Sequence, residues 1–382
     1  MQPMRNSSSR FGAKLQHIAL LGGSLLFCFF AIELCLRVYY GNPPLFRDPQ
    51  VRHVRVLYGY KPEPNQRNTY SLDQPVVTNA FGFRDDHDWI VPRPAGMLRI
   101  MTLGDSLTFG NATASDDVYA KVLERRLNQT LGSVEVINTS AGAWNTDTEV
   151  AFFLQEGWQY DPSILVLGFY PNDWVWPLKP GEAAPSAELS QEARVEGRPP
   201  WLRWLPYRAI YFFKRSAAVM YLRNLIVVAT SGPDFVSELL LNKVDLEKNE
   251  TIALTFSWLL RLKLACNERG IPMVIASIPP VNQFWLPRRP IGYVQHLQRF
   301  CESHGISFVD LAEGFWRVGD WKRLYMHPWD NHLSAEGHRN VAAQLEPVIL
   351  RLAASVRPGR HGPHGRPSGS LSPAPARGRG PE

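Results

Sequence analysis

The sequence has few cysteines, and its central part has almost no net charge. Only four of the 382 residues are cysteine, and none shows the spacing of a metal site. The formal net charge is +6, but residues 1–14 contribute +3 and residues 357–382 contribute +4, which leaves about −1 for everything between. A nearly neutral body offers no phosphate-binding surface, which argues against a nucleic-acid partner.

The sequence also lacks internal repeats, and its cysteines give little structural information. Cys28 and Cys35 lie in an N-terminal apolar stretch, while Cys266 and Cys301 fall in separate predicted helices. Two buried thiols are favoured there, and a disulfide is the alternative if this part of the chain is exported. The 45% hydrophobic and 20% charged shares are those of an ordinary globular protein.

Residues 15–40 form an apolar stretch with no charge before Glu33. Its length is near the lower limit for a membrane-spanning helix, and basic residues precede it. We expect an uncleaved signal anchor, with residues 1–14 cytoplasmic and the rest of the chain periplasmic at an inner membrane. A cleaved signal peptide is the alternative, but no clear small-x-small cleavage site follows. Glu33 is expected to be an interfacial carboxylate rather than a functional acid inside the bilayer.

Beyond residue 96, short apolar strands alternate with helix-length segments. Because the strands are apolar throughout, the pattern predicts an α/β, doubly wound, mainly parallel five-stranded sheet flanked by helices. The predicted strands are residues 100–103, 134–138, 164–169, 273–277 and 306–309. The predicted helices are residues 116–129, 147–158, 246–269, 291–303 and 334–354.

The same pattern gives the expected domain organisation. A lead-in over 41–95 precedes one globular domain over 96–355. The tail over 356–382 is rich in Pro, Gly and Arg and should be disordered. Residues 174–245 interrupt the alternation with an aromatic and basic helical insertion. Helices packed on the domain are favoured there, while a cap over the site and a helix on the membrane surface remain alternatives.

Polar or glycine residues follow three strands and precede the last helix. In a doubly wound sheet the carboxyl ends of the strands form the ligand site, so these residues should converge on one edge. They are Gly104-Asp105-Ser106 after the first strand, Gly142 after the second, Asn172-Asp173 after the third, and Asp330 with His332 before the last helix.

In order and placement these residues resemble the Ser, Gly, Asn and His blocks of the GDSL, or SGNH, hydrolases. The resemblance covers about residues 98 to 354, and residues 78–86, "TNAFGFRDD", are similar to the segment before the Ser block in membrane-anchored bacterial members. It implies the SGNH fold, related to flavodoxin-like folds, and an esterase that needs no cofactor or metal.

The resemblance also implies a role for each residue. Ser106 would be the nucleophile, His332 the general base and Asp330 the acid that orients it. The backbone N–H groups of Ser106 and Gly142 and the amide of Asn172 would form the oxyanion hole. Asp105 and Asp173 would support these groups.

Two positions depart from the family pattern. The family spaces its acid and histidine as Asp-x-x-His, but Trp329 stands three residues before His332, so a Ser–His dyad remains an alternative to a triad. Tyr170 stands where the third block normally has glycine.

Two other classes of site fit less well. An α/β-hydrolase elbow requires Gly-x-Ser-x-Gly, and Thr108 occupies the last position. A metal site is a weaker alternative, because the spacing of the candidate ligands does not place three of them on one helix face. These candidates are His327, Asp330, His332 and His338.

The combined prediction is a membrane-anchored extracytoplasmic serine esterase that acts through an acyl-enzyme. The expected substrates are O-acyl or O-acetyl groups of a cell-envelope carbohydrate, or a lipid ester. An O-acyltransferase using the same site and a non-catalytic glycan-binding module are the alternatives. The sequence leaves the oligomeric state open.

Overall fold

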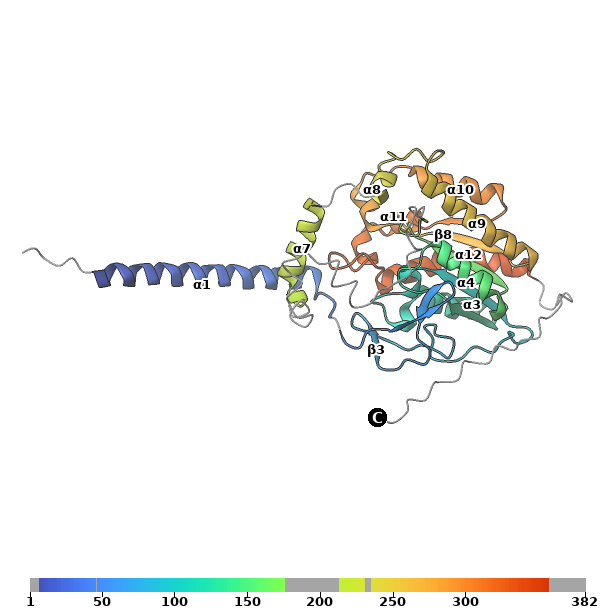
Figure 1. Ribbon diagram of the computed structural model, residues 1–382, viewed down its shortest axis with the longest axis horizontal. Coiled ribbons are helices and arrows are strands. Elements are labelled where there is room, and N and C mark those ends of the chain that lie inside the picture. The colour runs from blue at the N-terminus through green and yellow to red at the C-terminus, as the bar shows by residue number, and fades with distance from the viewer. Residues whose placement is uncertain (1–6, 46, 176–212, 231–234, 357–382) are drawn as a thin grey trace, which may run out of the picture. The chain divides into compact units, whose positions relative to one another are not determined.

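The computed structural model describes residues 7–45, 47–175, 213–230 and 235–356 (Figure 1). The chain divides into two compact units. Among the described residues, one unit contains the helices α1 (Ser7–Tyr40) and α7 (Ala217–Thr230). The other contains every strand and the remaining helices. Residues 357–382 of the predicted tail lie outside the described residues, as do residues 176–212 and 231–234 of the predicted insertion.

The second unit is built on a five-stranded sheet in the order β6-β5-β7-β8-β9, with every neighbouring pair parallel. The predicted α/β fold class is therefore confirmed. The strands are β5 (Leu98–Gly104), β6 (Val134–Asn138), β7 (Ile164–Phe169), β8 (Met273–Ser277) and β9 (Ser307–Asp310). Three of the five have the predicted bounds. β5 is longer at both ends than predicted, and β9 begins and ends one residue later.

Helices cover both faces of this sheet, which explains the continuous apolar strands (Figure 1). Alternate residues of β5 enter different cores: Ile100 packs with residues of α3 and α12, whereas Met101 packs with residues of α4, α9 and α10. The helices of this unit are α2 (Ser106–Phe109), α3 (Tyr119–Leu131), α4 (Thr146–Gln155), α8 (Phe235–Leu240), α9 (Glu250–Glu268), α10 (Gly292–Ser303), α11 (Ala312–Val318) and α12 (Ala335–Ser355).

Local chemistry corrects three helix boundaries. The helix predicted from residue 246 begins at Glu250, because Asn249 caps it by accepting from the Ile252 N–H at 3.1 Å. The segment predicted from residue 116 starts as a short 3₁₀ turn, and extended Val118 separates that turn from α3. The helix predicted to reach residue 158 ends at Gln155, and a 3₁₀ turn follows over Gly157–Tyr160.

The lead-in forms two antiparallel hairpins that the sequence pattern did not predict. They pair β1 (His53–Val56) with β2 (Gly59–Pro62), and β3 (Thr69–Ser71) with β4 (Gln74–Val76). The lead-in also contacts the loops at the carboxyl edge of the sheet: buried Arg84 donates to the carbonyls of Phe109, Gly110 and Thr113. It therefore packs as part of the same body as the sheet.

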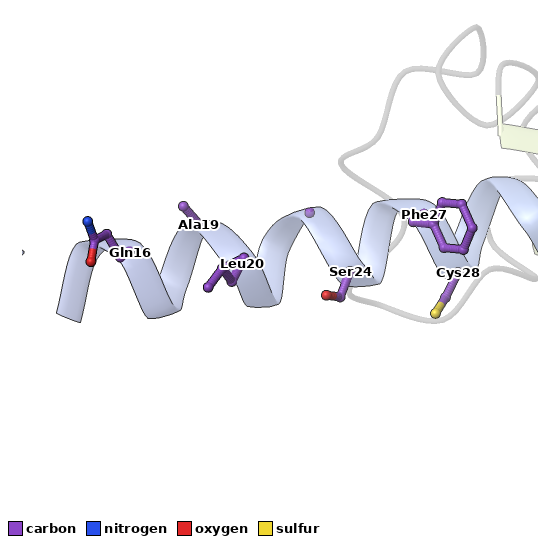
Figure 2. A pocket seen from close by; sticks show the side chains of 7 residues that line it. Gln16, Ala19, Leu20, Ser24, Phe27 and Cys28 are labelled. Carbon is purple, nitrogen blue, oxygen red and sulfur yellow. The ribbon is translucent and has the colours of Figure 1, made fainter. Parts of the chain in front are cut away.

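The helix α1 is long and apolar enough over Gln16–Tyr40 to cross a membrane, by length and composition. A signal sequence near the N-terminus would meet the same criteria. Small side chains leave a hollow on one face of α1 (Figure 2). Its lining residues all belong to α1, so the hollow is surface relief on an exposed helix and carries no argument for a ligand site.

Cys266 and Cys301 are both buried, free thiols, as favoured from the sequence. Burial raises the pKa of each to about 12, so neither thiol ionises near neutral pH.

Candidate active site

Ser106 begins a single helical turn directly after β5. Asp105 caps that turn, because its Oδ1 accepts a hydrogen bond of 2.8 Å from the Leu107 N–H. Gly110, in the left-handed conformation at φ 79°, ends the turn. The hydroxyl of Ser106 is thereby held at the carboxyl edge of the sheet.

His332 meets Ser106 across 226 residues of sequence. The Ser106 hydroxyl lies 2.9 Å from His332 Nε2, and the other ring nitrogen, Nδ1, is hydrogen-bonded to Asp330 Oδ1. The same Oδ1 also accepts from the His332 backbone N–H at 2.9 Å. The chain turns tightly here, since the N–H of Asp330 donates to the carbonyl of Met326. This turn lets an acid two residues before the histidine reach its ring, so the spacing departure does not separate the pair.

The charges within this pair favour a proton on the imidazole. Burial opposes the charged forms of both groups, but their mutual hydrogen bond and attraction outweigh it. The pKa of His332 is therefore raised above its usual value, and the pKa of Asp330 is lowered. The arrangement suits a histidine that must accept a proton while a carboxylate stabilises the resulting cation.

The predicted oxyanion residues lie beside the serine. A Cβ placed on Gly142 would come 3.9 Å from the Ser106 Cβ, so Gly142 brings backbone against the nucleophile. The Asn172 amide donates to Asp105 Oδ2 at 3.1 Å, which places it next to the same turn. Asp173, the next residue, stabilises the loop that carries Asn172, because its Oδ2 accepts from the Tyr170 N–H at 2.7 Å.

A group of buried acids lies beneath this edge. Asp105, Asp173 and Glu149 of α4 are all 0% exposed, and neither carboxylate oxygen of Glu149 has a hydrogen-bond partner among the described residues. Burial, followed by repulsion from neighbouring acids, raises the pKa of Glu149 and Asp173 well above the usual range. Burial also raises the pKa of Asp105, against its hydrogen bonds from Leu107, Asn172 and the Ser106 hydroxyl.

Two polar residues at the site were not found from the sequence. Asn111 Nδ2 lies 3.4 Å from His332 Nε2, and the hydroxyl of Ser71 in β3 lies 2.9 Å from Asn111 Oδ1. Ser71 also accepts from the Ala112 N–H at 3.3 Å, which leaves its hydroxyl proton for Asn111. The only sequence signal for Asn111 is its place just after the turn that carries Ser106, and Ser71 has none.

The four residues of the metal alternative have separate surroundings. His338 is buried, and its Nδ1 accepts from the Tyr119 N–H, while the ring of His327 packs against Trp321. Asp330 and His332 contact each other directly, as a hydrogen-bonded pair. Within the described ranges, the close His and carboxylate group is instead Asp85, Asp86 and His87, and Asp85 already accepts from Trp89 and Lys121.

The sequence matches the GDSL-like lipase/acylhydrolase family over residues 102–339. The match covers more than half of the chain and spans the Ser106 turn, Gly142, Asn172 and His332. The chain therefore belongs to the GDSL-like lipase/acylhydrolase family. Accordingly, it is a serine hydrolase that acts on ester bonds.

Three similar solved structures are all distant in sequence. A lipase/acylhydrolase from Enterococcus faecalis is 16% identical, with 69% of this chain and 100% of that chain covered and a TM-score of 0.39. The esterase EstA from Pseudoalteromonas is 12% identical, with 67% and 98% covered and a TM-score of 0.39. A two-domain esterase active on acetylated mannans is 14% identical, with 69% and 51% covered and a TM-score of 0.40. A search of curated proteins found no match.

Proposed function

We propose that this chain is a membrane-anchored, extracytoplasmic esterase that removes O-acyl groups, O-acetyl above all, from a cell-envelope carbohydrate. The observation that carries the proposal is the 2.9 Å contact between Ser106 Oγ and His332 Nε2, with Asp330 on the other ring nitrogen. The apolar length of α1 supports the anchor. In the topology proposed for this anchor, the catalytic domain faces the cell envelope.

The proposed reaction follows from these contacts. Ser106 Oγ attacks the ester carbonyl carbon while its proton passes to His332 Nε2, and Asp330 stabilises the imidazolium. The N–H groups of Ser106 and Gly142 and the Asn172 amide stabilise the oxyanion. The C–O bond to the sugar then breaks, and the sugar oxygen takes the proton from Nε2. Water gives a proton to the same nitrogen and attacks the carbonyl carbon of the acyl-serine. The bond from that carbon to Ser106 Oγ then breaks, Oγ takes the proton back from Nε2, and the carboxylic acid is released.

The polar side chains around Ser106 support a sugar alcohol as the leaving group. Asn111 and Asn172 provide amides near the nucleophile, and His332 provides the proton. These side chains make the surroundings of the reacting ester polar, which supports a leaving group rich in hydroxyls over one that carries an acyl chain.

The test compares the full-length wild type with Ser106→Ala, and uses Ser303→Ala as the matched serine control, because Ser303 is exposed on α10. Acid release is measured from acetylated oligosaccharides and from phospholipid esters, alongside fluorophosphonate labelling.

We expect labelling and acetate release in the wild type and Ser303→Ala, and neither in Ser106→Ala. Undiminished labelling of Ser106→Ala would overturn the nucleophile assignment. Cleavage of lipid esters alone would overturn the carbohydrate assignment, and transfer of acetyl to a glycan hydroxyl in place of water would identify an acyltransferase.

A further inference from the structure

Glu33, near the C-terminal end of α1, is enclosed by hydrogen-bond donors from α7. Its carboxylate accepts from the Ser216 hydroxyl at 2.8 Å and from the backbone N–H groups of Ala217 at 3.0 Å and Ala218 at 2.8 Å. Arg37, one turn further along α1, adds a contact of 2.7 Å from its Nε. Ser216 is the N-cap of α7, since its hydroxyl oxygen accepts from the Val219 N–H at 3.2 Å, and Glu33 accepts from the first two N–H groups of the helix from a distant part of the sequence.

This arrangement neutralises the one acid within the apolar length of α1. A carboxylate near a bilayer is costly unless it is paired and hydrogen-bonded. The N-terminus of α7 contributes two orphan N–H groups and the positive end of its dipole, and Arg37 contributes a full charge. Arg37 also donates to the carbonyl of Arg215 at 2.6 Å, so the clamp holds the chain on both sides of Ser216.

The rest of α7 divides into a packed face and an exposed apolar face. Ala217 and Met220 are buried, and the rings of Tyr221 and Tyr40 stack with centroids 6.0 Å apart. Leu222 and Leu225, three residues apart on the helix, remain 58% and 52% exposed. The 14-residue helix is about 21 Å long, too short to cross a hydrocarbon core of about 30 Å.

We infer that α7 lies in the extracytoplasmic lipid interface as a second membrane element, held to the anchor by Glu33. The inference rests on the membrane anchoring proposed above. The occupant of the exposed face is lipid, because that face adjoins the end of α1, whose own apolar side chains, such as Leu26 at 60% and Phe30 at 64%, are exposed. In addition, α7 runs across the end of α1 (Figure 1), as expected for a helix in the membrane plane beside one that spans it.

The charges near α7 fit this placement. Lys214 and Arg215 precede its first turn, and Arg223 is exposed beside Leu222. Basic side chains at this depth meet lipid phosphates while neighbouring leucines enter the acyl region. The interfacial tyrosines of α1, Tyr39 and Tyr40, mark the same level.

The experiment measures the depth of single labels in full-length protein reconstituted into vesicles of phosphatidylcholine and phosphatidylglycerol. The background carries Cys28→Ser and Cys35→Ser, because the other two cysteines are buried. Leu222→Cys and Leu225→Cys each carry an NBD fluorophore. Leu26→Cys on α1 reports anchoring, and Ser303→Cys on the catalytic unit reports the aqueous phase. Quenching is measured with nitroxide lipids and with iodide.

We expect lipid quenching at positions 26, 222 and 225, and iodide quenching alone at position 303. Adding Glu33→Ala should increase iodide quenching at position 225 at least several-fold while position 26 stays in lipid, because only the hydrogen bonds from Glu33 to the start of α7 are lost.

Lipid quenching at position 26 together with iodide quenching alone at positions 222 and 225 would overturn the inference and leave the anchor intact. Protection of 222 and 225 from both quenchers would show that protein covers the face, which also overturns it. Iodide quenching at position 26 would overturn the anchor itself and the inference with it.

Discussion

Asn172 Nδ2 donates a hydrogen bond of 3.1 Å to Asp105 Oδ2, which joins the loop after β7 to the cap of the nucleophile turn. Asp105 uses its other oxygen to cap the Leu107 N–H. One buried carboxylate thus fixes both the turn that holds Ser106 and the amide proposed for the oxyanion hole. Only one of the two Asn172 amide hydrogens is used in this bond, so the other is free to face the substrate.

The first prediction concerns this pair. Asn172→Ala should lower kcat by about 10²–10³-fold with little change in KM, because an oxyanion donor acts mainly in the transition state. Asp105→Asn should also lower kcat, since its new amide N–H group would face the Asn172 N–H group and displace it. Steady-state kinetics of the two single variants and the double variant provide the measurement.

The double variant discriminates between mechanisms. If Asp105 acts through Asn172, adding Asp105→Asn to Asn172→Ala should cost much less than it does in the wild type. Circular dichroism of each variant controls for folding, because Asp105 also caps α2. Fully additive losses would contradict the proposed link between the two residues.

The second prediction concerns the pH dependence of His332. The base must be neutral, so activity falls as pH drops through its pKa, which Asp330 holds above the usual value. Asp330→Asn removes this support, and burial then lowers the pKa of His332. We expect the acidic limb of kcat/KM to move to lower pH while the maximum falls by more than about tenfold, because the imidazolium is less stabilised. A pH–rate profile with an unchanged limb and maximum would favour a Ser106–His332 dyad.

The third prediction assigns Asn111 a positioning role. Its Nδ2 presents a donor to His332 Nε2, which favours the neutral ring, and Ser71 orients the amide. Asn111→Ala should therefore lower kcat several-fold and move the acidic limb to higher pH, the opposite direction from Asp330→Asn. Ser71→Ala should act in the same direction but more weakly, whereas Ser303→Ala should act in neither. An unchanged pH profile in Asn111→Ala would refute the role.

Much of the sheet and the site could be predicted from local sequence. Apolar runs such as residues 164–169 are buried on both faces, so they carry a strong strand signal with sharp ends. Because parallel strands end at one edge, Ser106 and Asn172 could be placed at the same edge of the sheet from the sequence. The convergence of His332 on Ser106 is consistent with the same reasoning.

The parts that escaped prediction depend on long-range contacts with weak local patterns. The β3 and β4 strands have three residues each, too few for a period-two signal. Asn111 receives its orientation from Ser71, forty residues earlier, and no spacing rule connects them. Glu33 was predicted to be an interfacial carboxylate, but its partners at Ser216 and Ala217 are visible only once α7 is packed on α1.

The fourth prediction concerns stability at low pH. His338 is buried in α12, and burial, followed by repulsion from Arg84 and His332, lowers its pKa to about 3 from an ordinary 6.5. As pH falls, the unfolded chain binds a proton at this histidine before the folded protein does. The free energy of unfolding therefore has its full value above about pH 6.5 and decreases as pH falls toward 3, by on the order of 3 kcal/mol between pH 7 and pH 4. His338→Gln keeps an acceptor for the Tyr119 N–H but cannot titrate. Urea unfolding at pH 7 and pH 4 should show a smaller loss of unfolding free energy in this variant than in the wild type.

The raised pKa values of Glu149 and Asp173 change stability with pH in the opposite direction, but equally in both proteins, so they cancel in the comparison. Equal losses in the two proteins would mean that His338 does not titrate as its burial requires.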